Sequence, residues 1–169
     1  MWLHDVDGIV TAVQLGETVD YIADFADAAS VQEFTDLLSA AGCAISLTQE
    51  GPLVGRWDRG RLDQIITNLL GNALKYGRGE PIEISLRSDG QRARIVVRDH
   101  GIGISPADHA RIFERFERAV VGGHYGGFGV GLWTVQQLTA ALGGTVHLES
   151  ALGAGATFSI ELPLRTAPG

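Results

Sequence analysis

Two asparagines four residues apart in a helical segment, followed by three separate glycine clusters, most limit how this chain can fold. The asparagines are Asn68 and Asn72, and their spacing places both amides on one helix face, where they can contact one ligand. The glycine clusters lie in residues 101–103, 127–131 and 153–155. Glycine lets the backbone approach a bulky ligand closely. The combination predicts a nucleotide site, with the paired amides at its metal–phosphate end.

Size and charge narrow the classes of function. The chain has 169 residues, of which 45% are hydrophobic and 20% charged, as expected for one soluble domain. Its net charge of −7 argues against a general binder of nucleic acids or anionic membranes, because an acidic surface repels phosphate. The single cysteine, Cys43, is expected to be a buried hydrophobe in a reducing compartment. With no membrane-length apolar stretch and no secretion signal, we expect a cytoplasmic domain without direct membrane contact.

Hydrophobic periodicity and turn residues predict a mixture of strands and helices. The clearest helix begins at Asp58 and ends at Gly77, because apolar residues recur at every third or fourth position between them. Asp89 and Gly90 predict the turn of a β-hairpin. Further helices are expected at residues 31–38, 106–116 and 130–142, and strands at residues 43–48, 53–57, 82–87, 93–98, 145–150 and 157–162. This order predicts a two-layer α/β sandwich.

Five ordered motifs give the chain a resemblance to a known family. They are similar to an N box, a first glycine box, an F box, a second glycine box and a last glycine box, at residues 63–76, 97–104, 112–118, 127–132 and 153–158. With these motifs the chain resembles the catalytic ATP-binding domain of sensor histidine kinases, within the superfamily that includes gyrase, Hsp90 and MutL ATPases. Any one motif alone would be a weak signal, whereas five in this order are specific.

The resemblance implies a Bergerat-type ATP-binding fold, in which a mixed, mostly antiparallel sheet of about five strands packs on three helices. The catalytic ATP-binding domain would span residues 31–165. Residues 1–30 have weak patterning and would be an N-terminal segment or linker, and residues 166–169 would be a tail.

The resemblance also implies a site for ATP and Mg²⁺. Asn72 would supply an oxygen ligand to magnesium, and Asn68 would hold a metal-bound water or a phosphate oxygen. Asp99 would accept a hydrogen bond from the exocyclic amine of adenine and so reject guanine. Lys75 and Arg118 would neutralise phosphate charge and, with Asn68, would be the catalytic residues. The other expected nucleotide contacts are Tyr76, Gly101, Gly103, Gly127, Gly129, Val130, Gly131, Leu132 and Thr157.

Two details of the motifs bear on the reaction. ATPases of this superfamily place a glutamate at the position of Asn68 as a general base, and an amide cannot take a proton at neutral pH. Transfer to a protein acceptor is therefore favoured over rapid hydrolysis. The glycines of residues 127–131 precede a helix whose N-terminal amides attract phosphate, and the chain contains no P-loop. We expect residues 120–128 to form a mobile lid, in which Phe128 departs from the usual Thr or Ser.

These features predict the ATP-binding catalytic domain of a sensor histidine kinase. In two-component signalling it would transfer the γ-phosphate of Mg-ATP to a histidine on a dimerisation hairpin, for relay to a response regulator. We expect that hairpin to lie outside this chain, because His4 is followed by Asp5 but lacks the Arg and Pro of a phosphoacceptor box. Two alternatives stay open: a stand-alone serine kinase of the anti-sigma-factor type, which Phe113 and Phe116 disfavour, and a nucleotide-binding module without transfer activity, which Phe128 leaves open.

Overall fold

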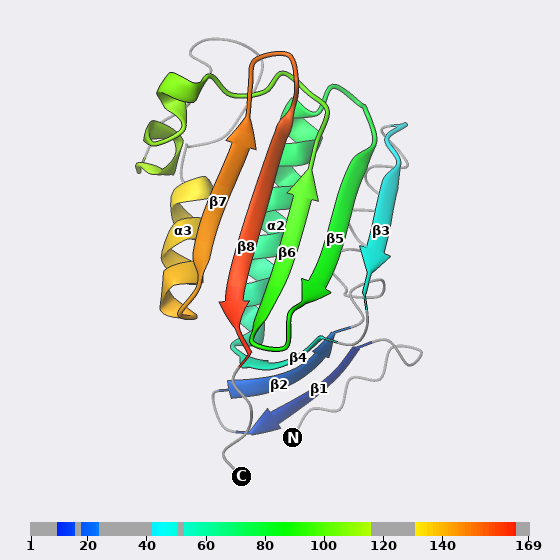
Figure 1. Cartoon of the computed structure of the whole chain (residues 1–169), viewed down its shortest axis with the longest axis vertical. Coiled ribbons are helices and arrows are strands. Elements are labelled where there is room, and N and C mark those ends of the chain that lie inside the picture. Colours follow the sequence, from blue (N-terminus) through cyan, green and yellow to red (C-terminus); the bar gives the residue numbers. More distant parts are fainter. Residues whose placement is uncertain (1–9, 16–17, 24–41, 51–52, 116–130, 165–169) are drawn as a thin grey trace.

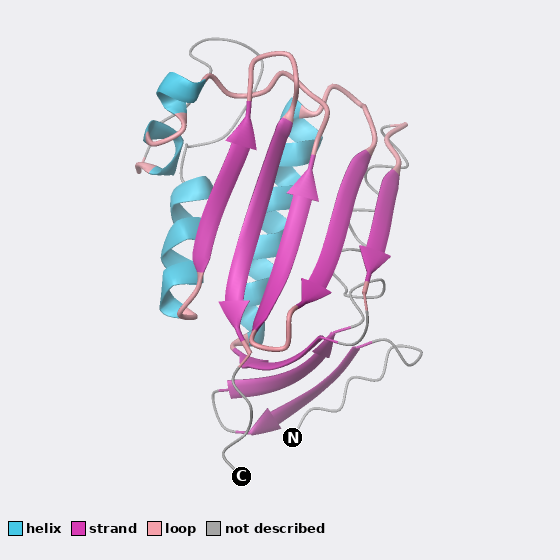
Figure 2. Ribbon diagram, in the orientation of Figure 1, coloured by secondary structure: helices cyan, strands magenta, loops and turns pink. Residues whose placement is uncertain are grey.

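A five-stranded sheet forms the centre of the molecule in a computed structural model, which describes residues 10–15, 18–23, 42–50, 53–115 and 131–164. In spatial order the strands are β3 (Ile45–Gln49), β5 (Ile82–Ser88), β6 (Arg92–Arg98), β8 (Ala156–Pro163) and β7 (Thr145–Ser150). β3 runs parallel to β5, and the other neighbouring pairs are antiparallel. Helices α2 (Arg59–Tyr76) and α3 (Gly131–Ala141) cover one face of this sheet (Figure 1, Figure 2). The predicted two-layer sandwich with a mixed, mostly antiparallel sheet is confirmed.

Local sequence accounts for the bounds of α2. The Asp58 side chain accepts a hydrogen bond from the backbone amide of Arg61 at 3.0 Å, which satisfies one of the free donors of the first turn. At the other end, the amide of Gly77 donates to the carbonyl of Ala73 at 2.9 Å. A side chain at Gly77 would collide with the same carbonyl, so glycine is needed here. The predicted helix from Asp58 to Gly77 is confirmed.

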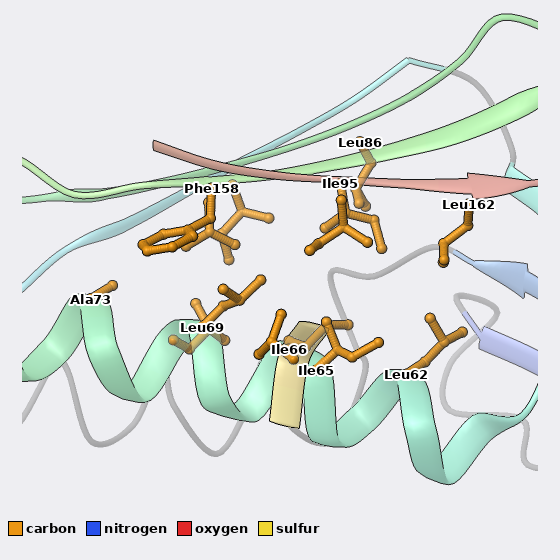
Figure 3. Packing of buried hydrophobic residues seen from close by; sticks show 14 of the residues in the cluster. Leu62, Ile65, Ile66, Leu69, Ala73, Leu86, Ile95, Phe158 and Leu162 are labelled. Atoms are coloured by element: carbon orange, nitrogen blue, oxygen red, sulfur yellow. The ribbon is translucent and has the colours of Figure 1, made fainter. Parts of the chain in front are cut away.

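The hydrophobic core lies between α2 and the inner face of the sheet (Figure 3). Its buried side chains from α2 recur at helical spacing, and those opposite come from alternate positions of the strands. They include Leu62, Ile65, Ile66, Leu69 and Ala73 of the helix and Leu86, Ile95, Phe158 and Leu162 of the sheet. Full burial of one such aliphatic side chain contributes roughly 1.5–3 kcal/mol. The same packing fixes the orientation of α2, which carries the two asparagines.

A second sheet of three strands lies at one end of the first (Figure 1). It consists of the antiparallel strands β1 (Val10–Leu15), β2 (Thr18–Ala23) and β4 (Leu53–Trp57), in that order. The sequence pattern predicts no element within residues 1–30, so β1 and β2 are additions. The strand at residues 53–57 is confirmed, but it pairs with β2 and not with β3. The buried Trp57 joins this sheet to the main body, since its indole N–H donates to the carbonyl of Pro163 at 3.1 Å.

The short helix expected at residues 106–116 is instead two 3-10 turns, Pro106–Asp108 and Arg111–Phe113. Tertiary contacts hold the chain in this region. His109 Nε2 lies 3.2 Å from the carbonyl oxygen of Ile104, and the Phe113 ring packs edge-on against Phe158 with centroids 6.4 Å apart. Phe113 therefore packs against the core, as expected.

The β5–β6 hairpin and the strands β7 and β8 lie where the sequence predicts them, with ends that differ by one residue. The Asp89 side chain accepts hydrogen bonds from the amides of Gln91 and Arg92, at 2.8 and 2.7 Å, and so closes the predicted turn. The helix expected at residues 31–38 lies outside the described residues. Neither described α-helix is both long and apolar enough for a membrane crossing.

Candidate nucleotide site

Three segments that are distant in sequence meet at one end of the five-stranded sheet (Figure 1). They are the C-terminal end of α2, the segment after β6, and the turn between β7 and β8, while α3 begins farther along the sheet, beside Asn68 of α2. Backbone hydrogen bonds join the three segments. The amide of Ile102 donates to the carbonyl of Tyr76 at 3.1 Å, and the amide of Gly155 donates to the carbonyl of Gly101 at 3.1 Å. The last glycine motif is thereby placed beside the first one.

Asp99 is a buried carboxylate at the centre of this arrangement. Only 5% of its surface is exposed, and its Oδ1 accepts hydrogen bonds from the amides of Gly101 at 2.9 Å and Ala156 at 3.3 Å. Both bonds end on Oδ1, and within the described part of the chain no donor contacts Oδ2, so its lone pairs can accept a further hydrogen bond. A carboxylate so oriented can recognise one N–H group with little loss of side-chain entropy.

Burial raises the pKa of the Asp99 carboxyl above its ordinary value, because the charged form is poorly solvated there. The hydrogen bonds from Gly101 and Ala156 and the neighbouring His100 act in the opposite direction and lower the pKa, but burial is the larger effect. The protein therefore holds a carboxylate in a position that opposes its charge. Such placements are concentrated at functional sites.

Glycine is required at two positions around Asp99 because backbone lies where a side chain would be. A Cβ at Gly101 would collide with the carbonyl of Tyr76 and lie 2.6 Å from the Cα of Gly77. A Cβ at Gly155 would collide with the carbonyl oxygen of Asp99 and lie 2.8 Å from the Cα of His100. The sequence motifs predict that these glycines make room for a ligand. In the structure they first make room for neighbouring chain segments.

The segment after β6 is also fastened by a serine that lies outside the predicted motifs. Ser150 accepts a hydrogen bond from the amide of Ile104 at 2.8 Å and donates one to the carbonyl of Gly155 at 2.6 Å. The sequence signal that could have indicated this role is its position at a strand end, directly before a glycine-rich turn. A serine hydroxyl there tends to form hydrogen bonds with the nearby backbone. Ser150 thus connects the first and last glycine motifs.

The two asparagines lie on α2, whose C-terminal half faces the site. Both are half-buried, and a Cβ at Gly131 would be 3.6 Å from Asn68 Oδ1. The first residue of α3 thus lies beside the Asn68 amide, where an added Cβ would make an ordinary van der Waals contact. Lys75, in the last turn of α2, is exposed, and Tyr76 is half-buried. The structure thereby places Asn68 and Gly131, two of the predicted nucleotide contacts, close together.

Thr157 lies apart from the other candidate residues. It pairs with Arg98 of β6, and paired residues share a face of the sheet. Asp99 follows Arg98 directly and is buried on the opposite face, the side that packs on the helices. Ala156, whose amide contacts Asp99, is the residue of the last glycine motif on that side. Thr157 is therefore placed on the open face, away from the Asp99 carboxylate.

Several candidates lie outside the described residues: Arg118, Gly127, Gly129, Val130, and Phe116 and Phe128 of the expected F box and lid. Gly103 and Leu132 are described. Gly103 has a positive φ of 70°, and a Cβ there would collide with the carbonyl of Ala151. Leu132 is half-buried against the core. In the described part of the chain no three His, Cys, Asp or Glu side chains gather as a metal site.

Comparison with known proteins identifies the family. Residues 57–166 match the model of the family described as histidine kinase-, DNA gyrase B- and HSP90-like ATPase. The chain is 38% identical over 141 residues to the sensor histidine kinase RppB of Synechocystis sp., a match that covers 81% of this chain and 31% of RppB.

Solved structures agree with the sequence relatives. The mycobacterial sensor histidine kinase MprB is 28% identical, with a TM-score of 0.73 over 82% of this chain and 93% of that one. Full-length ShkA, solved in complex with AMPPNP, is 33% identical with a TM-score of 0.73 over 94% of this chain and 33% of ShkA. This chain thus spans about a third of the length of RppB and ShkA. It belongs to the histidine kinase-, DNA gyrase B- and HSP90-like ATPase family, and its relatives are sensor histidine kinases.

Proposed function

We propose that this chain is the catalytic domain of a sensor histidine kinase, which binds Mg-ATP and presents its γ-phosphate to a histidine on a separate hairpin. The observation that carries the proposal is Asp99, a buried carboxylate with Oδ1 fixed by two backbone amides and Oδ2 left for a donor. The exocyclic amine of adenine is such a donor. Guanine presents a carbonyl oxygen at that position, which a carboxylate repels, so the site would select ATP.

The phosphates would lie toward the N-terminal end of α3, near Asn68 and Gly131. The free amides and the dipole of a helix N-terminus favour negative charge. Lys75 and Arg118 would add positive charge, Arg118 by analogy with the family motif alone. These charges would position the terminal phosphate of the bound nucleotide. In phosphoryl transfer the protein acts mainly by such positioning and charge stabilisation, and forms few covalent bonds itself.

The donor set of α2 fits magnesium. Mg²⁺ takes oxygen ligands, keeps several waters and is commonly held by one or two protein oxygens together with substrate phosphates. Asn72 offers one amide oxygen on the same helix as Asn68, four residues away, so both can approach a metal–phosphate unit. When bound, the ion would offset phosphate charge. Asn72 would hold the metal and Asn68 a metal-bound water or a phosphate oxygen.

Calorimetry tests the proposal directly. ATP should bind more tightly than GTP, and removing magnesium should weaken ATP binding. Asp99→Asn should raise the Kd for ATP at least about tenfold, or ~1.4 kcal/mol, because the amide presents only one lone-pair oxygen. Equal affinities for ATP and GTP in the wild-type protein would exclude Asp99 as the adenine-reading residue. Glu149→Gln, a charge change on exposed β7, is the matched control and should bind ATP normally.

A further inference from the structure

Asp99 lies between two side chains that point away from it. Residues alternate between the faces of a strand, so Arg98 and His100 project to the open face while Asp99 is buried on the helix face. The open face is the one that α2 and α3 leave uncovered (Figure 1). Whatever holds Arg98 and His100 on this face also fixes the backbone on both sides of Asp99.

One carboxylate on the neighbouring strand contacts both of these side chains. Glu83 of β5 is the direct partner of Arg98 in the β5–β6 ladder. Its Oε2 lies 3.7 Å from Arg98 Nη1, and its Oε1 lies 3.2 Å from His100 Nε2. Each carboxylate oxygen of Glu83 thus contacts the side chain of one residue adjacent to Asp99. The three side chains are 35–50% exposed, so each contact is individually weak.

We propose that Glu83 is a positioning residue for nucleotide recognition: by bridging Arg98 and His100 it holds the Asp99 backbone so that the carboxylate faces the base. The inference rests on the proposed function, in which Asp99 reads adenine. β6 ends at Arg98, so beyond that residue the regular ladder no longer restrains the chain on the β5 side. The His100–Glu83 contact extends that restraint by two residues, to a point directly before Gly101.

A second carboxylate on the same open face provides a matched control. Glu161 of β8 contacts two arginines of β6, Arg92 at 3.5 Å and Arg94 at 3.9 Å. It makes the same kind of cross-strand bridge, though it is less exposed than Glu83 (27% against 48%), and it lies at the other end of β6 from Asp99. Loss of Glu161 removes as many ion pairs as loss of Glu83 and touches no residue of the site.

The experiment compares Glu83→Ala, Glu83→Gln and Glu161→Ala with the wild-type protein. Calorimetry gives the Kd for ATP, and NMR-detected hydrogen exchange gives the protection of the Gly101 amide, which bonds the Asp99 carboxylate. Glu83→Ala should raise the Kd for ATP about two- to fivefold, as expected for the loss of two exposed contacts. It should reduce protection of Gly101 by a similar factor. Glu83→Gln, which keeps an acceptor for His100, should recover part of both, and Glu161→Ala should change neither.

The outcomes separate this inference from the proposed function. If Glu83→Ala folds and keeps the wild-type Kd and Gly101 protection, Glu83 positions nothing, while the proposed function stands. Equal losses in Glu161→Ala would also overturn the inference, because the effect would then be one of general sheet stability. If the wild-type protein fails to bind ATP, the proposed function is wrong, and Gly101 protection alone decides whether Glu83 holds the segment. If Glu83→Ala does not fold, Glu83→Gln tests the inference. Its Kd for ATP should then be raised and its Gly101 protection reduced relative to the wild-type protein, and wild-type values for both would overturn the inference.

Discussion

At the scale of single residues, the burial of Asp99 lowers the stability of the protein at the position where we propose that it binds the nucleotide. Asp99 is buried, its pKa is raised by burial, and the amides of Gly101 and Ala156 only partly offset that effect. On the proposed function, this arrangement keeps an acceptor oxygen ready for the nucleotide and lowers the stability of the empty protein. Mutations at Asp99 should therefore affect binding and stability in opposite directions.

Asp99→Asn should stabilise the empty protein at neutral pH while weakening ATP binding. The native state keeps the Asp99 proton to a higher pH than the unfolded chain, because the pKa is raised in the fold. Stability from this group is complete below the ordinary aspartate pKa and is lost as pH rises through the raised pKa. Asparagine does not titrate, so the Asp99→Asn variant does not lose stability in this way. Its free energy of unfolding, relative to that of the wild-type protein, should therefore increase between about pH 3 and about pH 7. Urea titrations across this range measure it. An advantage that shrinks with rising pH would contradict the pKa direction.

Gly101→Ala should disrupt the site, whereas Gly71→Ala should be harmless. The methyl group at residue 101 would meet the carbonyl of Tyr76 and force α2 and the segment after β6 apart. At Gly71, within α2, nothing lies within 4 Å of the added Cβ, and alanine has the higher helix propensity. We expect thermal unfolding to show a loss for Gly101→Ala and a gain of about 0.5–1 kcal/mol for Gly71→Ala. An unchanged midpoint for Gly101→Ala would show that the two segments separate easily.

At the scale of elements, α2 connects stability to the site. Its buried face packs on the sheet, and Asn68, which is half-buried, lies beside the start of α3. The helix is fixed at its first residue by Asp58 and at its last by Gly77. Gly77 lies beside Asp99, since a Cβ at Gly77 would be 3.6 Å from the Asp99 Cβ. A change at Gly77 should therefore affect the site, whereas a change at Asp58 should affect the stability of the helix alone.

Asp58→Ala should lower the free energy of unfolding by about 1 kcal/mol, because the amide of Arg61 loses its acceptor. Asp58→Asn keeps an oxygen at that position and should recover most of the loss. Denaturant unfolding of the three proteins gives both values. Since Asp58 lies at the end of α2 remote from Gly77, the ATP affinity of folded Asp58→Ala should equal that of the wild-type protein. A loss of affinity alone, without a loss of stability, would be the contrary result.

At the scale of the whole molecule, the fold brings together a site but, on our proposal, leaves the phosphoryl acceptor to another part of the system. The described residues hold one core, built mainly from α2 and the inner face of the sheet, and one end at which Asp99, Gly101 and the end of α2 meet. Asn68 offers no basic lone pair to activate water at neutral pH. On the proposed function, this chain by itself should therefore bind ATP without turnover.

The isolated chain should bind ATP but neither label itself nor hydrolyse ATP at a rate typical of an ATPase. Incubation with γ-labelled ATP, followed by analysis for acid-labile phosphate, tests both. Adding a separate hairpin domain that bears a complete histidine box should restore transfer, and Asn72→Ala should abolish it. Stable label on His4 would place the acceptor inside this chain. Normal transfer by Asn72→Ala would exclude that residue as the magnesium ligand.

The sequence by itself determined the elements whose information is local. The 3.6-residue period with Asp58 and Gly77 defined α2, and Asp89 with Gly90 defined the β5–β6 turn, because capping and turn chemistry act over a few residues. The ordered motifs similarly indicated the family, and they predict that Asn68, Asp99 and Gly101 share one site.

Only the tertiary structure decided the contacts that depend on strand register and on segments far apart in sequence. Pairing of β4 with β2 and not β3 has no local signal, since an extended strand can hydrogen-bond to any available edge. Thr157 lies on the other face of the sheet from Asp99 because of the β6–β8 register. A shift of that register by one residue would move every side chain of the strand to the other face. The need for glycine at residue 101 arises from a carbonyl of Tyr76, at the end of another element. These features are set by packing, which the local sequence pattern does not contain.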